Sequence, residues 1–181
     1  MADINWVPAI GTTYYSENTG VGVNLGTESN SYDENDSTYW GRGIQGYGTG
    51  SIHHIFRATF TQPISINRIK LVHAEAGFGN GGAGWWNWTL SAYYNGGWNT
   101  VGSGSGVNGG NHYNSPGTND YTGLTLTNVT AVQHEGNAYG NTVIGPPNPP
   151  AVIWSTTNEL YAYGPEDEGP SGNAMLFGAD F

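Results

Sequence analysis

The chain has 181 residues, and its four Lys+Arg against fourteen Asp+Glu give a formal charge of −10. Such an acidic chain is a poor partner for nucleic acid or for an anionic membrane surface, and the lack of cysteine excludes disulfides and thiolate metal sites. Thirty glycines, seven Trp and twelve Tyr are typical of one turn-rich, all-β domain whose aromatic rings fill the core.

The first residues, MADINWVPA, have neither a basic region nor a continuous apolar stretch, so they do not resemble a classical secretion signal. No segment approaches the ~20 apolar residues that a membrane-spanning helix needs, and we expect no membrane insertion. We assign residues 1–9 to an N-terminal arm in front of the folded domain.

Alternation of apolar and polar residues, punctuated by Gly, predicts strands along the chain and no amphipathic helix. Pro63 marks a corner between the first two of these strands. Asn95-Gly96 supplies the positive φ of a tight hairpin turn between the third and the fourth. The final segment is expected to form one strand or a pair. These strands are expected over residues 51–60, 62–74, 86–94, 98–103, 123–136 and 151–164.

Long Gly/Asn-rich loops at 77–84 and 102–120 separate the strands, and loops of this kind carry function on a β scaffold. Short strands with such loops predict an antiparallel β-sandwich or jelly roll over residues 10–164. Residues 165–181 form a C-terminal tail that is acidic at first and then apolar.

Four motifs follow one another in the order of a known family. DENDSTYW at 33–40 matches the pattern D-G-D-x-S-T-x-W, with Glu34 in place of Gly. PISINRIKL (63–71), WTLSAYYNGGW (88–98) and ELYAYG (159–164) match its later strands and hairpin. In this order the chain resembles the discoidin, or coagulation-factor type C, family of galactose-binding-like jelly rolls, which includes many bacterial carbohydrate-binding modules. The resemblance implies a non-enzymatic, glycan-binding β-sandwich.

The resemblance also implies calcium between the first acidic loop and the last strand. Calcium takes roughly six to eight hard oxygen ligands, so mixed side-chain and carbonyl oxygens suit it. The alternative is that Asp33 and Asp36 cap turns through Asx hydrogen bonds while Glu159 is solvated. The implied ligand set is Ser31 (through its carbonyl), Asp33, Asn35, Asp36, Thr38 and Glu159.

Sugar recognition needs a flat aromatic ring for the apolar face of a pyranose and polar groups for its hydroxyls. Because strand residues alternate, Trp85 faces one way and Trp86 the other, so at least one ring should lie outside the core. The alternatives are that these Trp residues pack in the core and that Arg42 pairs with an acid rather than with sugar hydroxyls. The candidate sugar-binding residues are Arg42, His73, Glu75, Asn80, Trp85, Trp86, His112, Asn137 and Tyr139.

The sequence contains no catalytic motif, since its five histidines are scattered and no nucleophile pattern is present. We therefore expect a non-enzymatic module for attachment to cell-surface or polysaccharide glycans. The rival interpretation is a structural component of a virion or filament, such as a phage decoration or fibre protein. Both interpretations place the protein on a virion or an extracellular surface.

The tail carries apolar side chains that a solvated segment does not need. Docked on a neighbouring subunit, with help from Trp6 of the N-terminal arm, they would drive a homo-oligomer or particle assembly. The alternative is that they fold back onto their own sandwich. These side chains are Met175, Leu176, Phe177 and Phe181.

Overall fold

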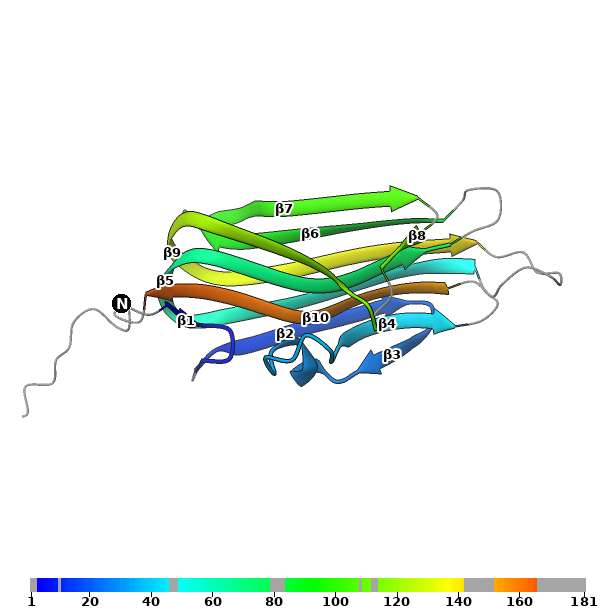
Figure 1. The fold of residues 1–181 in the computed structure, drawn as a ribbon, viewed down its shortest axis with the longest axis horizontal. Helices are drawn as coiled ribbons and strands as arrows, with labels where there is room; N and C mark the ends of the chain where they lie inside the picture. The colour runs from blue at the N-terminus through cyan, green and yellow to red at the C-terminus, as the bar shows by residue number, and fades with distance from the viewer. Residues whose placement is uncertain are drawn as a thin grey trace, which may run out of the picture.

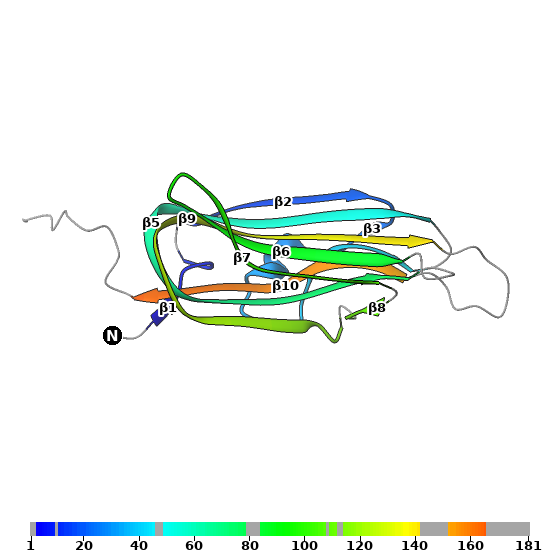
Figure 2. The same ribbon diagram turned by 90° about the horizontal axis from the view of Figure 1, so that it is seen from above.

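The computed structural model of the chain is an antiparallel β-sandwich, and Figures 1 and 2 show its two layers of strands. It confirms the all-β fold that the sequence predicts. In the part of the chain that the structure describes, the single helical element is the 3-10 turn η1 (Glu28–Ser31), and no helix is long and apolar enough to cross a membrane. The described residues are 3–9, 11–45, 49–78, 84–107, 109–111, 114–141 and 152–165.

The first layer consists of segments in which more buried and more exposed residues alternate, as expected for strands with one face on the core. Its order is β2 (Thr13–Gly20), residues 49–59 of β5 (Thr49–Gly77), residues 131–141 of β9 (Gly117–Asn141), β6 (Trp85–Tyr94) and β7 (Gly97–Val107).

The second layer lies across the core from the first. Two short strands extend it, because β1 (Asp3–Asn5) pairs with β10 and β8 (Gly109–Gly110) pairs with β5. Its order is β3 (Val23–Gly26), β4 (Trp40–Gln45), β10 (Val152–Pro165), residues 68–77 of β5 and residues 117–122 of β9.

The strands β5 and β9 belong to both layers, because each bends from one into the other at the same end of the molecule (Figure 2). The corner predicted at Pro63 is therefore present, but it lies within one continuous strand rather than between two. The pairing of β5 with β9 shifts register between Thr59 and Arg68. Such irregularities let hydrogen-bonded strands bend together without separating.

The predicted hairpin joins β6 to β7. Asn95 and Gly96 adopt φ values of 53° and 79°, which confirms the positive φ expected at this turn. The last predicted segment is a single strand, β10, which pairs with both β4 and β5.

Of the three apolar clusters among the described residues, two lie between the layers, and polar residues separate these two. The larger cluster includes Phe56 and Leu71, and the smaller contains Ile52 and Ile153. Along β5 the inward positions therefore change from apolar to polar and back to apolar. We call the intervening side chains the buried polar layer: His54, His73, Glu75, His134, Ser155 and Thr157.

Residues 3–9 are part of the sandwich, which corrects the prediction of an N-terminal arm. Asp3 pairs with Pro165, the Trp6 amide donates to the Ala162 carbonyl at 2.8 Å, and Val7 is fully buried in the larger cluster. Trp6 also packs against this cluster rather than projecting towards a neighbour. The apolar tail residues lie outside the described residues, so their predicted docking stays a prediction.

Replacing Val7 with Ala should lower the free energy of unfolding by about 1–3 kcal/mol, because it removes apolar atoms from a closed core. Asp3→Ala, at an exposed position of β1, is the matched control and should change it little. Urea unfolding of both variants measures the difference. Equal stability of the two would mean that residues 3–9 do not pack as described.

Candidate functional site

An aromatic pair lies on the solvent-facing side of the first layer. Trp85 of β6 is directly opposite Tyr139 of β9, with ring centroids 6.0 Å apart and ring planes 16° from parallel. Trp85 is 38% exposed. The stacked pair therefore offers apolar ring surface to a ligand from solution.

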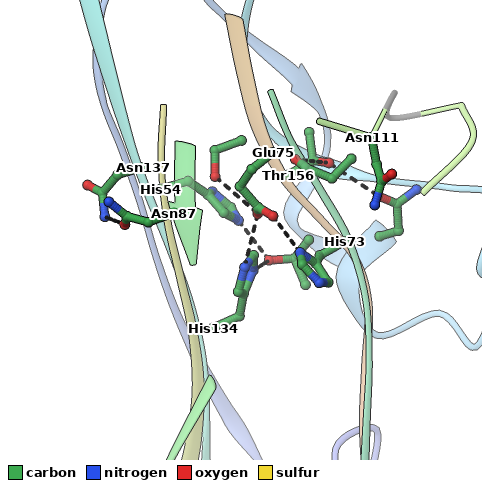
Figure 3. Close-up of polar contacts among 12 residues, drawn as sticks. His54, His73, Glu75, Asn87, Asn111, His134, Asn137 and Thr156 are labelled. Atoms are coloured by element: carbon green, nitrogen blue, oxygen red, sulfur yellow. Dashed lines mark hydrogen bonds and ion pairs between the residues drawn. The ribbon is translucent and has the colours of Figure 1, made fainter. Parts of the chain in front are cut away.

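Two amides lie beside this pair. Asn87 is opposite Asn137 in the same strand pairing, and Nδ2 of Asn137 donates to Oδ1 of Asn87 at 3.0 Å. Both are two residues from the aromatic pair along their strands, so they share its face at a distance of about 7 Å. Figure 3 shows the two amides on the other side of the strands from His134. We call Trp85, Asn87, Asn137 and Tyr139 the aromatic–amide patch.

The aromatic–amide patch unites three of the predicted sugar-binding residues: Trp85, Asn137 and Tyr139. Trp86 is half-buried and packs against both apolar clusters, as the alternation along the strand predicts. Asn87 was missed, although the same alternation places it on the face of Trp85. The predicted residues Asn80 and His112 lie outside the described residues.

Arg42 has a different role from either of those predicted. From β4, its guanidinium donates hydrogen bonds to the turn between β2 and β3 and to the start of β3. The donor–acceptor distances lie between 2.9 and 3.2 Å. Because these acceptors use its donors, Arg42 fixes the turn rather than binding sugar hydroxyls or pairing with an acid. The acceptors are the carbonyl oxygens of Gly20, Val21 and Gly22 and Oδ1 of Asn24.

His73 and Glu75 lie inside the sandwich, where they are 3% and 2% exposed. They follow Leu71 at alternate positions of β5, so they share its inward face. The prediction that these two residues line a sugar site at the surface is therefore wrong. They belong instead to the buried polar layer.

A chain of hydrogen bonds and close polar contacts crosses the buried polar layer (Figure 3). Oγ1 of Thr157 lies 2.7 Å from Nε2 of His54 and 2.8 Å from Nδ1 of His134. Glu75 lies between two histidines, with Oε2 2.5 Å from Nδ1 of His73 and Oε1 3.1 Å from Nε2 of His134. Ser155 adds a hydroxyl 3.5 Å from Oε1 of Glu75. This layer links the two sheets through polar contacts.

Burial and neighbouring charges shift the titration of this layer. Burial lowers the pKa of His54 well below its usual value, and the adjacent His134 lowers it further. Burial also lowers the pKa of His134, against the opposing effect of Glu75. Burial alone would raise the pKa of Glu75, but His73 and His134 hold it at about 2. Glu75 is therefore a buried carboxylate near neutral pH.

The acidic loop at 33–40 brings several oxygen atoms together. Oγ1 of Thr38 lies 2.8 and 2.9 Å from the two carboxyl oxygens of Asp33 and 2.8 Å from the Asn35 carbonyl oxygen. One hydroxyl hydrogen can satisfy only one acceptor at a time. Glu34 has a φ of 59°, so it adopts the positive φ that suits the Gly of the resembled motif.

Glu159 meets this loop from β10. The residue is fully buried, and Oε2 accepts from the Asn35 amide at 3.3 Å. Among the described residues, its Oε1 has no hydrogen-bond partner. Burial, followed by the nearby Asp33 carboxyl, raises the pKa of Glu159 to about 9. The alternative of a solvated Glu159 is therefore wrong, although Asp33 does make the expected Asx bond to the Asn35 amide at 3.1 Å.

One further predicted calcium ligand, Asp36, already has partners, whereas the prediction for Ser31 stays a prediction. The carboxylate of Asp36 accepts from Nζ of Lys70 at 2.7 Å and from the Tyr161 hydroxyl at 2.8 Å. It therefore ties the loop to the outer side of the second layer instead of facing Glu159. The Ser31 hydroxyl donates to the Thr157 carbonyl at 3.1 Å, and its predicted contribution was a carbonyl rather than this hydroxyl.

No family model matches the chain, and no curated protein matches it in sequence. The solved structures to which the chain is similar include family 32 carbohydrate-binding modules. One is the module of Clostridium perfringens NanJ in complex with galactose, with 14% identity over 90% of this chain and 100% of that one, and a TM-score of 0.48. Another is the module of Streptococcus pneumoniae EndoD, with 16% identity over 90% and 100% and a TM-score of 0.39.

A third similar structure is truncated AlyQ, which contains a family 32 carbohydrate-binding module and alginate lyase domains. The identity is 15% over 94% of this chain, and the TM-score is 0.46. The chain spans 36% of the length of that protein.

Replacing Thr157 with the isosteric Val should destabilise the fold by roughly 2–5 kcal/mol, because it leaves ring nitrogens of His54 and His134 buried without their shared partner. Thr100→Val, at an exposed position of β7, removes a hydroxyl at the surface and should have little effect. Chemical denaturation of both variants compares the two hydroxyls. A silent Thr157→Val would show that the buried hydrogen bonds contribute nothing.

Proposed function

We propose that the protein is a non-catalytic carbohydrate-binding β-sandwich that binds glycans through the aromatic–amide patch. The observation that carries this proposal is the stacked Trp85–Tyr139 pair, in which Trp85 is exposed, beside the Asn87–Asn137 amide pair. Glycans of cell surfaces or polysaccharides are the expected partners. A carbohydrate ligand is also what the names of the similar structures describe for those proteins.

The chemistry of the patch suits a sugar ring. The apolar C–H face of a pyranose covers the aromatic surface of Trp85, and amides both donate to and accept from hydroxyls. Because Nδ2 of Asn137 binds Oδ1 of Asn87, each amide has its orientation fixed before a ligand arrives. The patch itself contains no charged residue, and the chain carries a formal charge of −10. A neutral glycan therefore fits better than a polyanionic one.

Replacing Trp85 with Ala should weaken glycan binding by at least about tenfold, because the stacking surface is lost. The free energy of unfolding should fall far less than the ~3–5 kcal/mol of a core Trp, because the ring is exposed. A glycan array identifies a ligand for the unmodified chain, and calorimetry then measures both affinities.

Trp98→Ala is the matched control for this variant. Trp98 is 42% exposed on the same face, but it stacks on Arg57 at 4.9 Å rather than lying in the aromatic–amide patch. This variant should keep full affinity. If Trp98→Ala lost binding and Trp85→Ala retained it, the sugar site would instead lie at Trp98.

We propose further that the acidic loop holds one calcium ion, which stabilises the sandwich. Support comes from the donor set: the oxygens of Asp33, Asn35 and Thr38 gather within hydrogen-bonding distance of one another, and Glu159 brings a buried, unpartnered oxygen to the same loop. A dication would offset the burial and the nearby Asp33 carboxyl that raise the pKa of Glu159, and would so hold Glu159 as a carboxylate. The ion would tie the loop to β10. Asp36 is left out of this ligand set because Lys70 holds it.

Calcium should raise the melting temperature relative to chelator, since a ligand at a hundredfold excess over its dissociation constant contributes about 2.7 kcal/mol. Glu159→Gln should abolish this difference while the chain still folds in chelator, because Gln is neutral and of similar shape. Glu135→Gln, on the half-exposed outer face of β9, should retain it. Identical melting of the unmodified chain with calcium and with chelator would refute the ion.

The rival interpretation, a virion or filament component, gains no support from the similar structures described above. The assembly contacts that it invokes fall on tail residues outside the described part of the chain. A location on a virion or an extracellular surface stays a prediction.

A further inference from the structure

Three side chains that are able to bind a metal converge in the buried polar layer. His73 and Glu75 come from the second-layer half of β5, and His134 comes from the first-layer half of β9. One ligand atom of each lies within 4.8 Å of the others (Figure 3). These residues are distinct from the oxygen-rich loop at Glu159 and from the aromatic–amide patch on the surface.

The hydrogen bonds fix the protonation of one side of this group. Nδ2 of Asn18 donates to the Gly41 carbonyl at 3.1 Å, so Oδ1 of Asn18 faces Nδ1 of His54 at 2.6 Å. An oxygen acceptor requires a proton on that nitrogen, so Nε2 of a neutral His54 accepts from the Thr157 hydroxyl. The same hydroxyl oxygen must then accept from Nδ1 of His134.

This arrangement leaves Nε2 of a neutral His134 unprotonated, with its lone pair inside the protein. It lies 3.1 Å from Oε1 of the Glu75 carboxylate, which is also an acceptor. Among the described residues, Nε2 of His134 has no hydrogen-bond partner of acceptable geometry. Two buried acceptors facing each other are unfavourable unless a positive charge lies between them.

We propose that this group binds one first-row transition-metal dication, with zinc as the first choice. The ligands are Nδ1 of His73, the carboxylate of Glu75 and Nε2 of His134. Two imidazoles and a carboxylate suit zinc, whereas calcium prefers oxygen alone. The site is independent of the proposed glycan-binding function.

Neighbouring side chains orient both imidazoles, and those around His134 favour it as a ligand. Thr157 holds the Nδ1 proton of His134 and so directs its Nε2 lone pair towards Glu75. Nδ2 of Asn119 lies 2.7 Å from Nε2 of His73, so metal binding at Nδ1 of a neutral His73 requires this amide to turn and present its oxygen to Nε2. Such outer partners fix the tautomer and orientation of metal-binding histidines.

The backbone leaves room for these ligands at Gly136 of β9. A Cβ atom at this position would lie 2.9 Å from Oε1 of Glu75 and would also collide with the Ser155 hydroxyl. That hydroxyl, 3.5 Å from Oε1 of Glu75, adds an oxygen to the group. Because all three proposed ligands are at most 3% exposed, the metal has a structural role and is taken up during folding.

To test this proposal, the full chain is refolded from denaturant with zinc and with excess calcium, which fills the oxygen-rich sites. The refolded chain is then dialysed extensively. Elemental analysis should find about one zinc per chain. Zinc X-ray absorption on this unmodified protein should show nitrogen ligands from two imidazoles. The zinc-loaded chain should melt at a higher temperature than chain refolded with chelator.

His134→Gln should lose the bound zinc. His53→Gln is the control, because His53 is a half-exposed histidine 3.1 Å from Glu135 and 3.9 Å from Glu17. This variant should keep the zinc. If His134→Gln fails to fold, X-ray absorption of the unmodified chain still decides. The proposal would be overturned if the unmodified chain retained no zinc, or if it bound zinc without two imidazoles. A proton would then lie between His134 and Glu75.

Discussion

The central constraint on this protein is the burial of the Glu75 carboxylate in the middle of a β-sandwich. A buried charge is costly unless it is paired and hydrogen-bonded, and the partners of Glu75 come from elements far apart in the sequence. His73 precedes it on β5, His134 reaches it from β9, and Ser155 reaches it from β10. Gly136 lacks the Cβ that would occupy this space. One carboxylate thus constrains inward positions on several strands at once.

This constraint also fixes the surface. Along β9, His134 faces inward while Asn137 and Tyr139 face outward, because strand residues alternate. A shift of one residue in the pairing of β9 would expose the histidine and bury the aromatic–amide patch. The buried polar layer therefore stabilises the register on which the patch depends. The bend shared by β5 and β9 completes the arrangement, since it carries His54 and His73 to opposite layers.

The two outer faces of the sandwich differ, and this difference decides where a ligand can bind. Over the second layer, Leu25 and Tyr39 cover Trp154, and Asp36 joins Lys70 and Tyr161. The acidic loop is thereby held against β10, where Glu159 enters it. The outer face of the first layer, by contrast, exposes Trp85 beside Tyr139. Covering one face stabilises the fold, and leaving the other open provides the surface that we propose for glycans.

The sequence by itself determined strands from residue 51 onward and the hairpin at Asn95-Gly96, because alternation and turn chemistry are local properties. It also separated Trp85 from Trp86. The family resemblance, rather than a local pattern, predicted that the acidic loop meets the last strand. The sequence did not determine that His73 and Glu75 are inside, or that residues 3–9 form an edge of the sheet. Those outcomes depend on which strands pair and in what register. Alternation states which residues share a face, but only the packing of the two layers decides which face is buried and which side chains meet there.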